Sequence, residues 1–507
     1  MERLNRLDTN NKVGILKKSA TELSHLVRTK QLSPVELVQM SISQIEKVNP
    51  SLNAMAENLF EQARILAQDL ENKIFQSQVE IELPLLGVPV TVKEMFAMQG
   101  ALRTAGSIHN KDKRMNFNST LVDRILKAGA IPICTTNVPE LGLWFETDNV
   151  IYGRTKNPYD LKRTSGGSTG GDAALIATAC SPVGLGSDIG GSVRIPAAFC
   201  GVFGHKPTSR LLPKTGHYPS TLESMKSVTR KNDSITGMGF LARHAEDLPL
   251  MMDLLAGPDQ IDQTIELDWK NLKHSANTLQ KKIYVIEDPV IKRCKSVDDD
   301  CKQAVRKAAD FFRSEGHIIE ALDPQIFIDT FEVWSAVTGS TQTSTFQHKM
   351  TQGQTISLFT ELFRHLIGNP RYTFPALVMC VLELFKDKKL AARGLEKAAK
   401  LGQKLDQILN DPLFASVILM PTHPRNAPRH QLPYVRPFDF CMTAAINPFE
   451  SPATSVPMGL NKKGLPLSVQ IVCGHNRDKV NFELAQKLEK KFGGWSDHFD
   501  LINSDGF

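Results

Sequence analysis

The sequence predicts an α/β protein in which a central mixed β-sheet is sandwiched by helices and carries a helical insertion. Short apolar segments with strand character alternate with amphipathic segments of helical period along most of the chain. The segment over about 325–410 differs, because its pattern is almost entirely helical. These two observations favour one sheet-based core with a helical addition over an all-helical or all-β protein.

We expect a single domain over the 507 residues, which are enough to bury one large core. It divides into a helical layer over about 15–75, a core over about 80–325 and 411–495, and an insertion over about 325–410. No internal repeat or low-complexity linker interrupts it.

Two serine capping boxes mark the first helices. Ser19 is followed three residues later by Glu22, and Ser33 by Glu36, with Pro34 at the first helical position. The pattern of apolar residues then predicts helices over about 20–29, 34–48 and 54–75.

The remaining elements alternate. Apolar runs predict strands over about 85–92, 130–135, 182–188, 283–286, 317–321, 417–420 and 467–472. Amphipathic or Ala-rich runs predict helices over about 119–128, 171–179 and 299–315, one from residue 388 onward, and one over about 481–492.

Charge and cysteine usage exclude several classes. The net charge is only +6 and no long block of like charge occurs, so nucleic acid is not an expected partner. None of the eight cysteines forms a CxxC pair and no His-ligand spacing occurs, so we expect reduced thiols, no metal and no cofactor. The N-terminal residues lack the apolar core of a signal peptide, and we therefore expect a cytoplasmic protein.

Two glycine-flanked serines stand out between residues 163 and 208. Ser168 lies within GGSTGG and Ser192 within DIGGSVR, at opposite ends of the predicted helix–strand unit. Glycine permits backbone conformations with positive φ, and successive glycines leave N–H groups free to face a hydroxyl. Free N–H groups beside a serine are what an oxyanion hole requires, so we interpret the stretch as the floor of an active site.

Three other interpretations of this stretch compete with that of an active site. A phosphate loop is disfavoured, because no GxxxxGK[ST] occurs and the charge of Asp172 would repel a phosphate. Residues 166–170 formally match a GxSxG nucleophile elbow, but the polar preceding segment with Pro158 does not predict the strand that this motif needs. Glycines that serve tight packing alone remain an alternative.

Lys93 and an aromatic segment complete the candidate site. Lys93 follows the predicted strand directly, where burial would lower its pKa from about 10.4; a lysine that extends to solvent is the alternative. Residues 141–145 are apolar and follow another strand, so we expect them to line a pocket, with a surface cluster as the alternative.

The most apolar run of the chain is 372–385. Its fourteen residues, interrupted by Pro375 and Glu383, are too few to span a bilayer. We expect a buried helix there, and the alternative is a peripheral membrane contact.

Three separated motifs resemble the amidase signature family of serine hydrolases. They are GVPVTVK ending at Lys93, GGSTGG at 166–171 and GSDIGGSVRIPAAFCGVFGHKPT at 186–208. The resemblance extends over about 15–495. Within the family the chain looks most similar to the fatty-acid amide hydrolase branch, type 2, on WFETDNVIYGRTKNPYDL at 144–161 and on PLSVQIVCG and KFGGW near the end.

The resemblance implies a Ser–cisSer–Lys triad. Ser192 corresponds to the nucleophile, Ser168 to the bridging serine after a cis peptide bond, and Lys93 to the base. The chemistry agrees, since no histidine lies near either glycine turn in the sequence and a neutral lysine acting through a second hydroxyl is a sufficient base.

The other implied site residues fall into three groups. The oxyanion hole corresponds to the N–H groups of Ile189, Gly190, Gly191 and Ser192, the supporting residues are Thr169, Asp188 and Arg194, and the substrate-binding residues are Leu143, Trp144 and Phe145. Two positions depart from the usual family pattern: Thr169 replaces a serine and Ser165 a proline. Thr169 keeps a hydroxyl, so we expect tuning of the site rather than its loss.

The implied function is hydrolysis of a carboxylic or fatty-acid amide to an acid and an amine or ammonia, through an acyl-enzyme. The expected partner is a small-molecule amide. A second copy of the chain, in a homodimer, is a further candidate partner. Two other functions remain open from the sequence: the glutamine-hydrolysing subunit of a tRNA-dependent amidotransferase, and a non-catalytic binding protein on the same scaffold.

Overall fold

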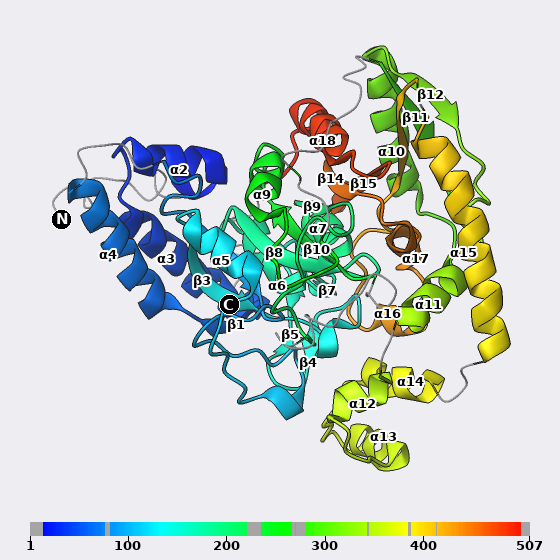
Figure 1. Cartoon of the computed structure of the whole chain (residues 1–507), viewed down its shortest axis with the longest axis horizontal. Coiled ribbons are helices and arrows are strands. Elements are labelled where there is room, and N and C mark those ends of the chain that lie inside the picture. Colours follow the sequence, from blue (N-terminus) through cyan, green and yellow to red (C-terminus); the bar gives the residue numbers. More distant parts are fainter. Residues whose placement is uncertain are drawn as a thin grey trace.

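An 11-stranded mixed β-sheet forms the centre of the molecule (Figure 1). The computed structural model describes residues 14–76, 82–220, 235–265, 269, 280–341, 344–383, 387–411 and 413–497. The strand order is β1-β3-β2-β8-β10-β9-β14-β15-β13-β11-β12. The predicted mixed α/β architecture is confirmed.

Three parallel strands organise one half of the sheet. They are β2 (Pro89–Lys93), β3 (Ile131–Thr136) and β8 (Val183–Asp188), all fully buried. β2 lies between the other two and is parallel to both. Because the carboxyl ends of parallel neighbours meet at one edge, the residues that end these strands are brought together there.

The N-terminal helices begin at their capping boxes as predicted. Helices α2 (Ala20–Arg28) and α3 (Pro34–Leu52) are capped by Ser19 and Ser33, whose hydroxyls accept backbone N–H groups while the third helical residue reaches back. The predicted helix over 54–75 is wrong at its start. Residues Met55–Asn58 form strand β1, which pairs antiparallel with β3, and helix α4 begins only at Phe60 and ends at Gln76.

Most other predicted elements are present with shifted ends. The strands are β11 (Lys281–Val285), β12 (Ile318–Ala321), β13 (Ala415–Pro421) and β15 (Pro466–Cys473). The helices are α5 (Thr120–Lys127), α6 (Gly170–Ala177), α10 (Asp299–Ser314), α15 (Lys388–Leu409) and α18 (Asp478–Phe492). The predicted strand over 85–92 starts later, at Pro89, because residues 84–87 form a turn.

Three central strands were not predicted. They are β9 (Phe203–Lys206), β10 (Gly237–Ala242) and β14 (Ala453–Leu460), which continue the sheet from β8 towards β15 with antiparallel pairing. Each is short or contains glycine, so its sequence carries little strand signal.

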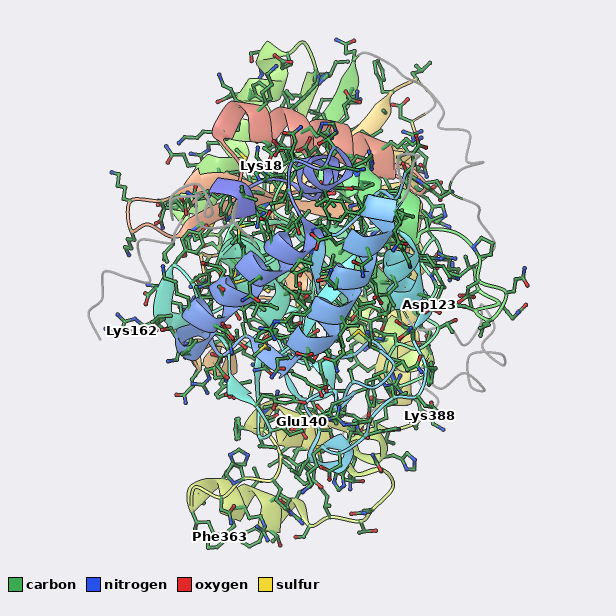
Figure 2. All side chains as sticks on the ribbon, turned by 90° about the vertical axis from the view of Figure 1, so that its left-hand side faces the viewer. Lys18, Asp123, Glu140, Lys162, Phe363 and Lys388 are labelled. Atoms are coloured by element: carbon green, nitrogen blue, oxygen red, sulfur yellow. The ribbon has the colours of Figure 1, made fainter. Side chains whose placement is uncertain are left out.

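The insertion is helical, as predicted. It contains α11 (Thr330–Thr341), α12 (Phe346–Thr351), α13 (Leu358–Leu366), α14 (Phe374–Glu383) and α15. Figure 1 shows α12, α13 and α14 grouped beyond the lower end of the sheet, while α15 runs along its side. The turned view of Figure 2 places Phe363 at the far tip of this group.

The run over 372–385 is only partly the buried helix that we expected. Helix α14 buries one side, with Leu377 and Cys380 inaccessible, but Phe374 and Leu382 on it are 41% and 55% exposed. Throughout the described ranges, no helix combines the length and the hydropathy that a bilayer crossing requires.

Candidate active site

The strand register places Lys93 inside the molecule beside β8. Val92 is paired with Leu185, so Lys93, the last residue of β2, lies beside the last residues of β8, which ends at Asp188. Its side chain is fully buried, which excludes the alternative of a lysine that extends to solvent. Lys93 is therefore held at the edge where the parallel strands end.

Three hydroxyl groups surround the Lys93 amine. Nζ lies 2.7 Å from Ser168 Oγ, 3.1 Å from Thr169 Oγ1 and 3.0 Å from Ser187 Oγ. Ser168 and Thr169 come from the first glycine turn, immediately before α6. The structure thus brings the predicted residues Lys93, Ser168 and Thr169 into one hydrogen-bonded cluster.

Burial controls the protonation of this lysine. Removal from water disfavours an ammonium ion and lowers the pKa of Lys93 from 10.5 to about 7, although the charges of Asp172 and Asp188 act in the opposite direction. Asp172, in the first turn of α6, accepts a hydrogen bond from Thr136, and its burial raises the pKa of its carboxyl to about 7. A large share of Lys93 is therefore a neutral amine near neutral pH.

Ser187 and His217 belong to the cluster but were missed from the sequence. The Ser187 hydroxyl lies 2.9 Å from His217 Nε2 as well as 3.0 Å from Lys93 Nζ. Burial, followed by the charge of Lys93, holds the pKa of His217 well below its usual value, so its imidazole is neutral. A serine within a buried strand was a weak signal for Ser187, whereas nothing in the sequence pointed to His217, which lies in a loop thirty residues further on.

An ion pair organises the second glycine turn. Arg194, at the start of α7 (Arg194–Cys200), donates from Nη2 and Nε to the carboxylate of Asp188 at 2.9 and 3.0 Å. Both side chains are fully buried, and Arg194 holds the pKa of Asp188 below its usual range. The same carboxylate accepts the N–H groups of Gly191 and Val193, so the pair fixes the backbone of the turn.

The hydrogen bonds of this turn differ from the predicted oxyanion hole at one residue, Gly191. The N–H of Gly191 is already donated to Asp188 Oδ1 at 2.7 Å, so it is not free. Within the described part of the chain, no acceptor is found for the N–H groups of Ile189, Gly190 and Ser192. A side chain on Gly191 is excluded, because its φ is +119° and a Cβ atom would lie 2.0 Å from Thr443 Oγ1.

The two glycine turns are in direct contact. The Thr169 N–H donates to the Ser192 carbonyl at 3.1 Å. The Gly167–Ser168 peptide bond is cis, as the resemblance implies. The expectation that no strand precedes Ser168 is wrong, since β7 (Asp160–Thr164) does so, but β7 forms a two-stranded sheet with β6 (Lys156–Asn157), separate from the central sheet.

A cavity of about 400 Å³ opens beside these turns. Ser192, Gly190, Ile189 and Gly167 lie in its wall at the catalytic end. Most of the other wall residues are aromatic or aliphatic and come from the loop after β3, from α11 and α14, and from residues 434–440: Leu143, Trp144, Phe145, Phe331, Trp334, Phe374, Val378, Met379, Leu382, Tyr434, Phe438 and Phe440. Of residues 141–145, which we predicted to line a pocket, residues 142–145 lie in this wall, whereas Leu141 is buried in a separate apolar cluster.

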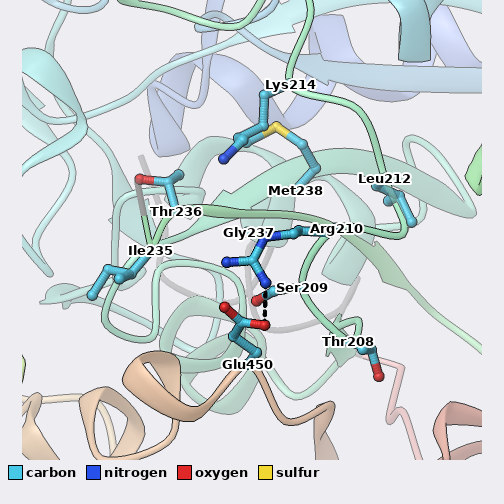
Figure 3. Close-up of a pocket in the computed structure, with 10 residues that line it drawn as sticks. All are labelled: Thr208, Ser209, Arg210, Leu212, Lys214, Ile235, Thr236, Gly237, Met238 and Glu450. Atoms are coloured by element: carbon cyan, nitrogen blue, oxygen red, sulfur yellow. Dashed lines mark hydrogen bonds and ion pairs between the residues drawn. The ribbon is translucent and has the colours of Figure 1, made fainter. Parts of the chain in front are cut away.

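A second hollow is too small for an organic substrate. Its volume is about 30 Å³, and an ion pair between Arg210 and Glu450 lies against it (Figure 3). Binding sites for small molecules usually measure about 300–1,000 Å³. Among the residues that the structure describes, no group of three or more His, Cys, Asp or Glu side chains could hold a metal ion.

Comparisons with known proteins agree on the family. The amidase family profile matches residues 36–480. Fatty-acid amide hydrolase 2 of Homo sapiens is 34% identical over 94% of this chain and 89% of its own length, and a glutamyl-tRNA(Gln) amidotransferase subunit of Treponema denticola is 28% identical over 93% and 98%. The crystal structure of a bacterial aryl acylamidase of the amidase signature family superposes with a TM-score of 0.77 at 25% identity, covering 97% of this chain and 99% of that one. The chain therefore belongs to the amidase family and is a hydrolase of amide bonds.

Proposed function

We propose that this amidase hydrolyses amides of long-chain carboxylic acids through the triad Ser192, Ser168 and Lys93. The observation that carries the proposal is the junction of two features: a neutral buried lysine bonded to Ser168, and an apolar cavity whose wall includes Ser192. The first supplies a base for a serine nucleophile, and the second supplies a site for an acyl chain.

The three hydroxyls around Lys93 match the bonding capacity of a neutral amine. In the neutral amine, one N–H group donates to Thr169 Oγ1 and the other to Ser187, whose Oγ lies 3.0 Å and whose carbonyl oxygen lies 3.4 Å from Nζ. The lone pair is then free to accept the proton of Ser168, whose Oγ lies 2.7 Å away. In the tautomer of neutral His217 that has no proton on Nε2, this nitrogen accepts the Ser187 hydroxyl, so that the Ser187 oxygen remains an acceptor for Lys93. The lone pair of Lys93 is thereby aimed at Ser168.

The reaction then proceeds in two halves. Ser168 gives its proton to Lys93 and takes that of Ser192, whose oxygen bonds to the amide carbon, and the carbonyl oxygen becomes an oxyanion that free N–H groups of the second turn stabilise. The relay returns the proton to the leaving nitrogen as the C–N bond breaks, which leaves an acyl-enzyme. Water, activated by the same relay, releases the acid and restores the Ser192 hydroxyl.

The cavity favours a fatty-acyl group over a small polar one. Its wall is mainly aromatic and aliphatic, and burial of an alkyl chain contributes about 0.8 kcal/mol per methylene. The similarity to fatty-acid amide hydrolase 2 supports the same substrate class. Glutamine hydrolysis, the alternative suggested by the amidotransferase relatives, would need polar partners for the substrate's ammonium and carboxylate groups. The charged residues that the structure describes in this wall are Arg293 and Glu383, and the rest of the wall is mainly aromatic and aliphatic.

The chain-length preference tests this assignment. Because Trp144 forms part of the wall, Trp144→Ala enlarges the cavity and should lower kcat/KM for the best wild-type chain by about tenfold, the scale of lost apolar contacts in a hydrophobic pocket. The measurement is kcat/KM over primary amides of 2 to about 18 carbons, with glutamine included. Leu413→Ala, an exposed site outside the cavity, is the control. A preference for glutamine, or a profile unchanged by Trp144→Ala, contradicts the proposal.

We further propose a peripheral membrane contact through the tip of the insertion. On and just after α13, Phe359, Phe363, Leu366 and Ile367 are between 52% and 84% exposed. Phe374 and Leu382 of the neighbouring helix α14 are also exposed and belong to the cavity wall. An exposed apolar helix face of this kind lies in a membrane interface, where a long-chain amide would be concentrated.

Sedimentation with lipid vesicles tests the contact. Phe363→Glu combined with Leu366→Glu should reduce the fraction bound to phosphatidylcholine–phosphatidylserine vesicles, because each charge would have to enter the interface. Phe75→Glu is the matched control, since Phe75 is 72% exposed on α4, in the N-terminal helical layer. Equal loss in both variants contradicts a contact through α13. The homodimer and the cytoplasmic location remain predictions.

A further inference from the structure

Trp334 connects the insertion to the second glycine turn. It lies on α11, and its indole Nε1–H donates to the carbonyl of Ile189 at 2.7 Å. Its ring packs edge-on against Phe440 at 5.0 Å between ring centres. A side chain of the insertion thus holds the backbone of the turn that carries Ser192.

The carbonyl of Gly190, the next residue of the turn, accepts a hydrogen bond from a different helix. The hydroxyl of Thr443, on α17 (Cys441–Ala444), donates to the carbonyl of Gly190 at 2.7 Å. Asp188 then accepts the N–H of Gly191, so the Gly190–Gly191 peptide is fixed at both ends. The preceding Ile189–Gly190 peptide differs, because within the described ranges its carbonyl is bonded to Trp334 and its N–H has no acceptor.

The Ile189 carbonyl and the Gly190 N–H belong to the same peptide group, so their directions are linked. In a planar trans peptide the C=O and N–H groups point in opposite directions. A donor that fixes the Ile189 carbonyl therefore also fixes the direction of the Gly190 N–H, which is one of the candidate oxyanion donors. Such donors stabilise a transition state only if they are oriented before the charge develops.

We infer that Trp334 is a positioning residue that orients the Gly190 N–H towards the developing oxyanion. The inference rests on the proposed function, because it assumes that the oxyanion forms beside Ser192. Trp334 does not touch the reacting atoms; it acts through the Ile189–Gly190 peptide.

The position of the Trp334 ring extends the inference to substrate selection. The ring is part of the cavity wall, between Phe331 on its own helix and Phe440. An acyl chain that fills the cavity presses on the same side chain that orients the Gly190 N–H. Long chains should therefore raise kcat and not only lower KM, and this effect on kcat should depend on the indole N–H.

The test compares Trp334→Phe with Trp144→Phe. Trp334→Phe keeps an aromatic ring but removes the donor to Ile189. Trp144→Phe makes the same change in the same cavity, at an indole whose buried Nε1 has no partner among the described residues, so it reports the effect of ring replacement alone. Replacement of Trp334 by β-(3-benzothienyl)alanine, which is isosteric but lacks the N–H, serves if the phenylalanine variant is unstable.

We expect Trp334→Phe to lower kcat for a long-chain amide by about 10- to 100-fold, less than the roughly 100- to 1,000-fold loss when an oxyanion donor is removed outright. KM should change little. The affinity for a long-chain trifluoromethyl ketone, which forms an oxyanion on the nucleophile, should fall in parallel with kcat, whereas the affinity for the corresponding free fatty acid should not.

Three outcomes are decisive. An unchanged kcat in Trp334→Phe, or equal losses for the ketone and the fatty acid, overturns the positioning role. A fall in kcat of the same size in Trp144→Phe overturns it as well, because the donor would then be irrelevant. Failure of the proposed function looks different, since the wild-type chain itself would then neither hydrolyse long-chain amides nor prefer the ketone to the acid.

Discussion

Amide hydrolysis by this chain is expected to rise about tenfold per pH unit below pH 7 and to level off above it, as a single base loses its proton. The reason is the burial of Lys93, which lowers its pKa from 10.5 to about 7. Only the neutral amine accepts a proton, so activity appears as pH rises through the pKa. The measurement is kcat/KM between pH 5 and about 9.5, which reports groups of the free enzyme.

Lys93→Met assigns this pH dependence to the lysine. Methionine keeps the length and the apolar stem but has no basic nitrogen, so kcat should fall by about 100- to 10,000-fold, the contribution of a general base. Lys206→Met is the control, because Lys206 is equally buried on β9 but bonds to the carbonyl of Pro207. A profile that is flat in the wild type, or that shifts in Lys206→Met and not in Lys93→Met, contradicts Lys93 as the base.

The two serines should differ in the size of their effects. Ser192→Ala removes the proposed nucleophile and should lower kcat by about 10⁴- to 10⁶-fold, as expected when a serine hydrolase loses its nucleophile. Ser168→Ala removes the bridge to Lys93 and should cost about 100- to 10,000-fold, the range for a proton-transfer group. The measurement is single-turnover hydrolysis of a long-chain amide.

Ser340→Ala is the control for both, because Ser340 is an exposed residue on α11 whose hydroxyl donates to the Val337 carbonyl of its own helix. Thermal unfolding of each variant separates a catalytic loss from a folding defect. If Ser168→Ala were the more damaging substitution, the order of the two serines in the relay would be reversed.

Local sequence signals predicted much of the fold. The capping boxes at Ser19 and Ser33 set helix starts through contacts within four residues, and the structure keeps both. Residues Met55–Asn58 are composed of residues that suit a helix, yet they form β1 because pairing with β3 determines their conformation. Strands β9 and β10 were not predicted for the same reason. Their sequences carry little strand signal, and pairing with the neighbouring strands determines their extended conformation.

The residues of the candidate site also fall into two groups: those that local sequence features indicated and those that only the tertiary structure brings together. Lys93, Ser168 and Ser192 were candidates because of glycine turns and a lysine at a strand end, which are features of adjacent residues, and their proposed roles came from the family resemblance. His217 and Trp334 could not be found, because each reaches the site from a distant loop or helix, and only the folded chain brings them to Ser187 and Ile189. The use of the Gly191 N–H by Asp188 likewise depends on a turn geometry that the sequence does not specify.

The most direct measurement of the central claim is covalent labelling of the purified chain by a fluorophosphonate, with the adduct mapped by peptide mass spectrometry. We expect one adduct on Ser192, its absence in Ser192→Ala, and a slower reaction at Ser192 in Ser168→Ala. Labelling that persists in Ser192→Ala and vanishes in Ser168→Ala would contradict this expectation, because Ser168 would then be the nucleophile.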